Sequence, residues 1–247
     1  MDSLPLENRV ALVTGASRGI GYQAALGLAS AGAHVIALAR TQGGLEALDD
    51  EIFAAAGRHA TLVPIDLRQP EGLDPLGAHL FERYGRLDLV VHAAAVLGPI
   101  TPTGHIDPRA WDETLAVNLT ASWRLIRAME PLLRASDAGR AIFLTTGRVQ
   151  RPKAFWGAYA ATKAGMEALV KCWADELEDT TVRAVLLDPN TMRTRMRAEA
   201  MPGEDPATVT HPSEIAPLIV ELAQADLGLP REAVMFQAWK ERGLPSP

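Results

Sequence analysis

Tyr159 and Lys163 are the two side chains of this sequence whose types and spacing are best suited to proton chemistry. They lie four residues apart in the segment YAATK. In a helix this spacing places the phenol and the ammonium on one face, one turn apart. A free tyrosine has a pKa near ~10, and an adjacent cation lowers that pKa because it stabilises the phenolate. The pair can therefore act as a general acid toward a carbonyl or as a general base toward an alcohol.

A glycine-rich segment near the N-terminus is suited to holding a second reactant. Residues 14–21 read TGASRGIG and lie between an expected strand and an expected helix. Glycine lets the backbone approach a pyrophosphate, and the N–H groups at the start of a helix bind such an anion. In this position the segment predicts a dinucleotide site, which includes Gly15, Ser17, Arg18, Gly19, Ile20 and Gly21.

The end of the next expected strand bears on the choice of dinucleotide. An NAD site usually has an acid there for the ribose 2′-hydroxyl, but this chain has Ala39 followed by Arg40. Arg18 and Arg40 supply two guanidinium groups, which suit a 2′-phosphate. We therefore predict NADP(H) as the cofactor, in preference to two solvated surface arginines. Asp66, after the third expected strand, either accepts a hydrogen bond from the adenine amino group or serves as a turn or cap residue.

Composition narrows the class of protein. The chain has 247 residues, is 48% hydrophobic and only 5% aromatic, so aliphatic side chains must form a large core. Its net charge of −6 argues against a nucleic-acid partner. We expect no membrane span and no secretory signal, because no apolar run is long enough and the start lacks a basic segment. The single cysteine, Cys172, favours the cytoplasm and is expected to be a small core residue.

Apolar strand-like runs alternate with helical patterns, which indicates βαβ units and a parallel sheet. Asp107 before Pro108 is a favourable helix start. We expect a single domain over residues 1–247, with a flexible loop at about 192–212 beside the substrate. Strands are predicted at 10–14, 34–39, 61–65, 87–94, 141–146, 182–187 and 233–236, and helices at 19–31, 43–56, 73–84, 108–133, 159–177 and 212–225.

The order of these motifs resembles that of the short-chain dehydrogenase/reductase family, from residue 9 to about residue 236. The TGASRGIG loop, Asp66, Asn118 and the YAATK segment fall in the family's order. The resemblance implies an α/β fold, a Rossmann-type doubly wound parallel sheet of about seven strands with helices on both faces. It also implies assembly into homodimers or homotetramers through the fourth and fifth helices.

The resemblance implies a role for each site residue. Tyr159 would be the catalytic acid or base, and Lys163 would lower its pKa and hold the nicotinamide ribose. Asn118 would anchor a water in a proton relay, and Thr146 stands where the family usually has a serine that hydrogen-bonds the substrate oxygen. Thr194 matches a threonine that contacts the nicotinamide carboxamide. The other residues expected at the cofactor are Leu67, Ala93, Ala94 and Pro189.

Three positions depart from the family pattern. Thr146 keeps the hydroxyl of the usual serine but adds a methyl that restricts its rotamers. The family's Asn-Asn-Ala-Gly is replaced by residues 92–95, HAAA, where His92 is a candidate to replace a structural hydrogen bond rather than to carry protons. Pro189-Asn190 stands for Pro-Gly, and asparagine tolerates positive φ better than other non-glycine residues.

Cationic residues follow Thr146. Arg148, Arg151 and Lys153 either form a rim that attracts an anionic substrate or partly closes the pocket, or they belong to a solvated loop. We favour the solvated loop. His105 and Trp156 either line the substrate pocket or are packing or surface residues.

The leading functional hypothesis is an NADP(H)-dependent oxidoreductase that interconverts a carbonyl and an alcohol on a small molecule, without a metal. The alternative is a catalytically impaired, nucleotide-binding regulatory protein, suggested by the departures from the family pattern. We favour the enzyme, because a binding protein has no need of Tyr159 and Lys163 at this spacing. Isomerase or dehydratase chemistry stays open, because a fold does not fix a reaction.

Overall fold

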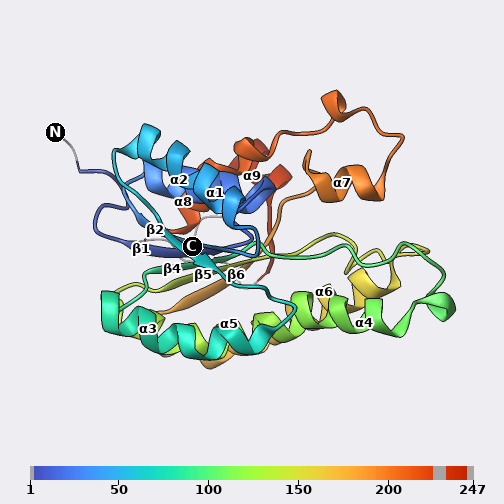
Figure 1. Ribbon diagram of the computed structural model, residues 1–247, viewed down its shortest axis with the longest axis horizontal. Helices are drawn as coiled ribbons and strands as arrows, with labels where there is room; N and C mark the ends of the chain where they lie inside the picture. Colours follow the sequence, from blue (N-terminus) through green and yellow to red (C-terminus); the bar gives the residue numbers. More distant parts are fainter. Residues whose placement is uncertain (1–2, 225–231, 244–247) are drawn as a thin grey trace.

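The computed structural model describes residues 3–224 and 232–243 and has a seven-stranded parallel sheet at its centre. The strand order is β3-β2-β1-β4-β5-β6-β7. Figure 1 shows the sheet between two layers of helices, with α1, α2 and α8 on one face and α3, α5 and α6 on the other. The predicted doubly wound α/β fold is confirmed.

The strands begin close to where the apolar pattern predicts them, and β1 and β2 have the predicted bounds. The others are shorter or shifted by one or two residues, because the buried apolar residues extend beyond the residues that pair in the sheet, on either side. Leu87, for example, is fully buried but donates its backbone N–H to the carbonyl of Leu132, in a helix. The strands are β1 (Val10–Thr14), β2 (His34–Ala39), β3 (Thr61–Pro64), β4 (Leu89–His92), β5 (Arg140–Leu144), β6 (Arg183–Asp188) and β7 (Val234–Met235).

Nine α-helices occupy the described residues. Two of them, α7 and α9, are short and were not predicted, since six or seven residues give little periodicity. The helices are α1 (Gly19–Ser30), α2 (Gln42–Ala56), α3 (Asp74–Tyr84), α4 (Pro108–Leu115), α5 (Ala121–Arg134), α6 (Gly157–Glu176), α7 (Arg195–Ala200), α8 (Ala216–Leu222) and α9 (Phe236–Arg242). None of the helices in this part of the chain is both long and apolar enough to span a membrane.

Two helix predictions and one loop prediction need correction. The helix expected at 108–133 is instead α4 and α5 joined by a π-helical turn, η3 (Ala116–Thr120). The segment expected at 212–225 begins as a 3-10 turn before α8, and its last residue lies outside the described residues. The loop expected at about 192–212 contains α7 and a parallel bridge between Met192 and Thr210, so it is structured.

Asp107 caps α4 as predicted, accepting from the N–H groups of Arg109 at 3.0 Å and Ala110 at 3.1 Å.

The two faces of the sheet form two aliphatic cores. Adjacent strand residues point to opposite faces, so that Leu12 packs with α3, α5 and α6, whereas Val13 packs with α1, α2 and α8. A parallel sheet covered on both faces needs such continuous apolar strands. Cys172 is not in either core. It is exposed in a groove between α5 and α6, because Val170 and Trp173 occupy the side of α6 that faces the sheet.

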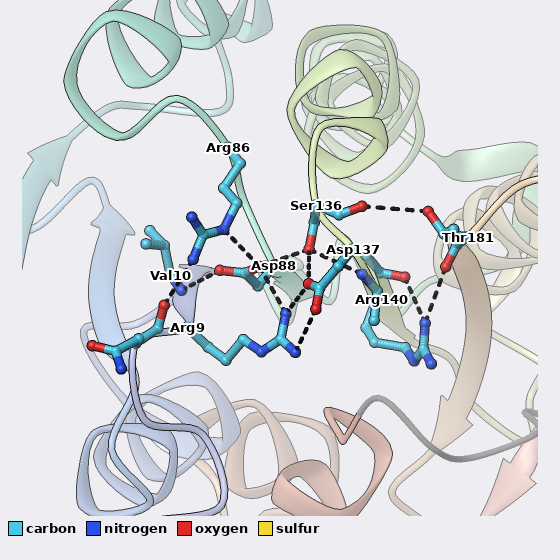
Figure 2. A network of polar contacts seen from close by, with 11 residues as sticks. Arg9, Val10, Arg86, Asp88, Ser136, Asp137, Arg140 and Thr181 are labelled. Atoms are coloured by element: carbon cyan, nitrogen blue, oxygen red, sulfur yellow. Dashed lines mark hydrogen bonds and ion pairs between the residues drawn. The ribbon is translucent and has the colours of Figure 1, made fainter.

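A polar network closes the amino-terminal edge of the sheet (Figure 2). Asp88, just before β4, has a buried carboxylate that accepts hydrogen bonds from Arg9 Nη1 at 3.1 Å and Arg86 Nε at 3.1 Å. It also accepts from Ser136 Oγ at 2.6 Å and from the backbone N–H of Val10 at 2.8 Å. The network joins the starts of β1 and β4 to the connection between α5 and β5, so its role is structural.

Asp88 and Asp137 offer a matched test of this network, because both carboxylates bind Arg9 but only Asp88 is buried. We expect Asp88→Ala to lower the free energy of unfolding by about 3 kcal/mol, since it removes the buried carboxylate that accepts from Arg9, from the Ser136 hydroxyl and from the N–H of Val10. Asp137→Ala removes an exposed partner and should cost less than about 1 kcal/mol. Urea denaturation of both variants measures the difference, and equal losses would contradict the assignment.

His92 links three elements where β4 ends. Its Nδ1 lies 2.8 Å from Thr14 Oγ1 on β1, and its Nε2 lies 3.0 Å from Ser122 Oγ on α5. Ser122 donates its own proton to the carbonyl of Asn118, so Nε2–H is the donor to Ser122. Thr14 Oγ1 accepts from the N–H of Ala94 and therefore donates to Nδ1. Both ring nitrogens are satisfied in the neutral form, which confirms the expectation that His92 makes structural hydrogen bonds.

The neutral state of His92 has a consequence for stability. Burial, together with the charge of Lys163, lowers the pKa of His92 to about 3. The unfolded chain binds a proton at this position below pH ~6.5, whereas the folded chain does not until about pH 3. The free energy of unfolding should therefore fall as the pH falls through this window, by up to ~1.4 kcal/mol per pH unit.

His92→Asn removes the titrating group and should flatten this slope. The measurement is urea denaturation of both proteins at several pH values between 4 and 7. His34, whose pKa burial also lowers, is retained in both proteins and cancels in the comparison. Identical slopes would show that His92 is not held neutral.

Candidate active site

Two adjoining cavities open at the carboxyl edge of the sheet. The strand order reverses between β1 and β4, and in open α/β sheets ligands bind at such a point. The first cavity has a volume of about 430 Å³ and the second about 780 Å³. Tyr159 and Thr194 line both, so the junction of the cavities lies beside the Tyr159 ring.

The first cavity brings together all the residues predicted to bind the cofactor. They come from the ends of five strands, the first turns of α1 and α6 and the segment before α7. They are Gly15, Ser17, Arg18, Gly19, Ile20, Gly21, Arg40, Asp66, Leu67, Ala93, Ala94, Tyr159, Lys163, Pro189 and Thr194.

The turn between β1 and α1 depends on glycine. Gly15 has a φ of +68°, and a Cβ placed there would lie 2.8 Å from the Cα of Ala94. A Cβ on Gly21 would lie 2.4 Å from the carbonyl oxygen of Gly15. Only residues without a side chain allow this turn to pack against the end of β4, which leaves the first N–H groups of α1 open to the cavity.

Two exposed arginines lie at the outer end of this cavity. Arg18 immediately precedes α1, and Arg40 immediately follows β2. Within residues 3–224 and 232–243, neither has a carboxylate within ion-pair distance. Two guanidinium groups beside a glycine turn are suited to an additional phosphate.

Asp66 has a partner that sequence reasoning missed. Its carboxylate accepts from Arg68 Nε at 2.9 Å and from the backbone N–H of Arg68 at 3.0 Å. These hydrogen bonds lower the pKa of the Asp66 carboxyl. Asp66 therefore acts as a turn residue while it lines the cavity, and Arg68 lines the cavity with it. The only signal for Arg68 in the sequence is its place two residues after Asp66.

Lys163 is buried one helical turn after Tyr159 and is fixed to the sheet. Its Nζ donates to the carbonyl oxygen of Leu144, the last residue of β5, at 2.7 Å. Burial lowers the pKa of Lys163 to about 8, and the charge of Glu167, one turn along α6, opposes that change. Glu167 is itself buried and accepts from Thr145 Oγ1 at 2.5 Å.

Tyr159 lies in the first turn of α6 with 9% of its surface exposed. Burial and the nearby charge of Asp188 raise its pKa to about 12, although a hydrogen bond from Thr146 favours the phenolate. The expectation of a lowered Tyr159 pKa is therefore wrong for this structure, because burial of the phenol and the charge of Asp188 outweigh the hydrogen bond from Thr146. Thr146 is brought to the tyrosine as predicted.

Asp188 and Glu167 are buried acids that the sequence analysis did not identify. Asp188 ends β6, and its carboxylate accepts from the N–H of Asn190 at 2.8 Å. Burial raises the pKa of Asp188. Asn190 has a φ of +60°, in agreement with the expectation that asparagine tolerates this conformation after Pro189. The sequence offers no signal that either acid is buried.

Asn118 lies apart from both cavities. It is fully buried in η3, where its Oδ1 accepts from the N–H of Val96 at 2.8 Å and its Nδ2 donates to the carbonyl of Val96 at 2.9 Å. Nδ2 also lies 3.2 Å from Thr162 Oγ1. The side chain thus fixes Val96, which lines the first cavity. Its role in anchoring a water stays a prediction.

The second cavity is lined by Thr146 together with Arg148, Arg151 and Trp156. Arg148 is half-buried and its guanidinium carbon lies 5.1 Å from the centroid of the Trp156 ring. The favoured interpretation of a solvated loop is therefore wrong for Arg148, but it holds for Lys153, which is exposed and outside the cavity. Of the two uncertain pocket residues, Trp156 lines the cavity.

His105 is exposed and lines neither cavity. Thr194 caps α7 by accepting from the N–H of Arg197 at 3.2 Å.

Known proteins with similar sequences are dehydrogenases and oxidoreductases, in agreement with the glycine turn and the tyrosine–lysine pair of this site. The family model described as short chain dehydrogenase matches residues 9–205. The uncharacterised oxidoreductase YciK of Escherichia coli K12 is 37% identical over 223 residues, covering 90% of this chain and 88% of that protein. An uncharacterised NAD-dependent oxidoreductase of Mycobacterium tuberculosis is 33% identical over 79% of this chain and 76% of its own length.

Solved structures show the same fold. A crystal structure of a short chain dehydrogenase from Escherichia coli CFT073, complexed with NADPH, superposes with a TM-score of 0.90 at 35% identity. The match covers 96% of this chain and 100% of that one. The fold, the glycine turn, the tyrosine–lysine pair and these relatives together show that the chain belongs to the short chain dehydrogenase family of oxidoreductases.

Proposed function

We propose that the protein interconverts a carbonyl and an alcohol on a small molecule, with NADP(H) bound in the first cavity and the substrate in the second. The observation that carries this proposal is the position of Tyr159. Tyr159 lines both cavities, its hydroxyl is hydrogen-bonded with Thr146, and Lys163 follows it one turn along α6. A proton donor at the junction of a nucleotide site and a substrate site is what carbonyl reduction requires.

The residues of the first cavity fit a dinucleotide. Gly15 and Gly21 let the turn between β1 and α1 pack closely against backbone that a Cβ would meet, and this packing leaves the N–H groups at the start of α1 open to the cavity. Arg18 and Arg40 would hold a 2′-phosphate, and Lys163 would contact the nicotinamide ribose. When bound, the nicotinamide supplies or accepts the hydride.

Tyr159 would donate its proton to the substrate oxygen in the reductive direction. A hydroxyl whose pKa is about 12 stays protonated until a stronger base develops beside it, as the oxygen of a reduced carbonyl does. Thr146 would orient that oxygen by a hydrogen bond. Lys163, protonated below about pH 8, would stabilise the phenolate that remains.

The preference for NADP(H) rests on charge. β2 is followed by Arg40 rather than by an acid, and Arg18 lies nearby in the glycine turn. The Escherichia coli relative was crystallised with NADPH, but the Mycobacterium relative is NAD-dependent, so family membership alone does not decide between the two. The two arginines support NADP(H).

An impaired, nucleotide-binding protein is the second candidate. It is supported by the methyl of Thr146 beside the reacting hydroxyl and by the side chain of Arg148 in the substrate cavity. It predicts that the unaltered protein binds NADPH and oxidises none of it with any carbonyl compound.

The cofactor preference can be tested by removing the two guanidinium groups. Arg18→Ala and Arg40→Ala should each raise the Kd for NADPH about tenfold or more, because each removes a charge-assisted contact with the 2′-phosphate. The Kd for NADH should change little. Arg109→Ala, an exposed arginine outside both cavities, is the control. Parallel losses for NADPH and NADH would show that the arginines do not read the 2′-phosphate.

The chemical role of Tyr159 can be tested separately from binding. Tyr159→Phe should retain NADPH binding, measured by calorimetry, and lose about 100-fold or more of the rate of NADPH oxidation with a panel of ketones and aldehydes. Turnover equal to that of the unaltered protein would contradict the mechanism. NADPH binding without turnover by the unaltered protein would favour the second candidate.

A further inference from the structure

The second cavity has an uneven distribution of charge that indicates what it binds. We propose that it selects carbonyl compounds that carry a carboxylate group, held by Arg148 with the assistance of Arg151. This inference rests on the proposed function, because it assigns the substrate class of the same site.

Arg148 is placed to meet a ligand that reaches Tyr159. Its guanidinium carbon lies 5.1 Å from the centroid of the Trp156 ring, and that ring meets the Tyr159 ring edge to face, with centroids 5.9 Å apart. One indole therefore separates the cation from the phenol. A guanidinium stacked on an aromatic ring keeps its in-plane N–H donors free, and these donors match the two oxygens of a carboxylate.

The charge of Arg148 has no protein carboxylate to neutralise it. In the part of the chain that the structure describes, no acid lies within ion-pair distance of Arg148 or Arg151. Arg197 lines the same cavity but is neutralised by Glu204, through two hydrogen bonds of 2.6 Å. The cavity thus holds a half-buried cation for which a bound anion would be the counter-ion.

The acids of the cavity favour one orientation of such a ligand. Asp188 lies near Tyr159, held by the N–H of Asn190 at 2.8 Å, and its charge would repel a carboxylate from the reacting end. The charge of Arg151 acts on Asp188 and is therefore partly balanced by it. Arg148 is for this reason the principal ligand for the anion. The other lining acid, Glu232, is exposed. The carbonyl would then lie against Tyr159 and Thr146, with the carboxylate toward Arg148.

The apolar lining suits the body of the ligand. Leu97 and Met192 are buried, and both line the cavity together with Met196 and Trp156. A rigid apolar spacer between carbonyl and carboxylate would lie along these side chains. Aromatic aldehydes that carry a carboxylate are therefore suitable probes.

Two probes of nearly equal shape isolate the charge: 4-carboxybenzaldehyde and its methyl ester. Their binding is measured by calorimetry on the protein saturated with NADP⁺, a complex that cannot reduce either aldehyde. The carboxylate should bind about tenfold or more tightly than the ester, as expected for a charge-assisted hydrogen bond. Added salt should reduce this ratio, since screening weakens the attraction.

Variants of the loop identify the residue responsible. Arg148→Gln should bring the ratio of the two affinities close to one, and Arg148→Lys, which keeps the charge without the planar donors, should restore part of it. Lys153→Gln removes a charge from the same loop outside the cavity and should keep the ratio of the unaltered protein. Thermal melting of each variant confirms that it is folded.

The outcomes separate this inference from the proposed function. Equal affinities for the two probes, binding of neither, or a ratio that survives Arg148→Gln would overturn the selection of carboxylates. Oxidation of NADPH with both aldehydes at equal kcat/KM would overturn it too, and would leave the proposed reductase intact. Selective binding of the carboxylate, with no oxidation of NADPH, would instead contradict the proposed function.

Discussion

The hydrogen bond between the ammonium of Lys163 and the carbonyl of Leu144 positions the candidate catalytic residues on the sheet. A buried ammonium is costly unless it is paired, and here the last carbonyl of β5 accepts it at 2.7 Å. This contact sets the position of α6 against the carboxyl edge of the sheet. Tyr159 begins the turn before Lys163, and Thr146 follows Leu144 by two residues, so the same contact brings the phenol and the threonine hydroxyl together. A shift of α6 by one turn would separate them.

The two edges of the sheet are built for different purposes. At the amino edge, the buried carboxylate of Asp88 uses its oxygens to bind four groups from three segments, which closes that edge (Figure 2). At the carboxyl edge, Gly15 and Gly21 have no side chain to cover the backbone of the turn. His92 supplies the hydrogen bonds that hold β1, β4 and α5 together next to this turn. Residues far apart in the chain therefore meet at an edge where the backbone is rigid and its N–H groups are free.

Much of this arrangement could be predicted from the sequence, because it depends on local signals. The strand bounds of β1 and β2 and the glycine turn follow from apolar runs and from glycine positions, whereas Leu67, Ala93, Ala94, Pro189 and Thr194 were expected at the first cavity from the family resemblance. The π-helical turn η3 could not be predicted, because the apolar pattern continues through it. The burial of Arg148 depends on Trp156, eight residues later. The pKa of Tyr159 was predicted in the wrong direction, because desolvation depends on the packing around the ring and not on the spacing to Lys163.

The central claim is that Tyr159 exchanges a proton with a molecule held beside a bound nicotinamide. The most direct measurement is a crystal structure of the protein with NADPH. We expect the nicotinamide ring to lie where the two cavities meet, with the Tyr159 hydroxyl close enough that one carbonyl group fits between it and the reactive ring carbon. A nicotinamide bound outside that junction, or a Tyr159 hydroxyl directed away from it, would contradict the account.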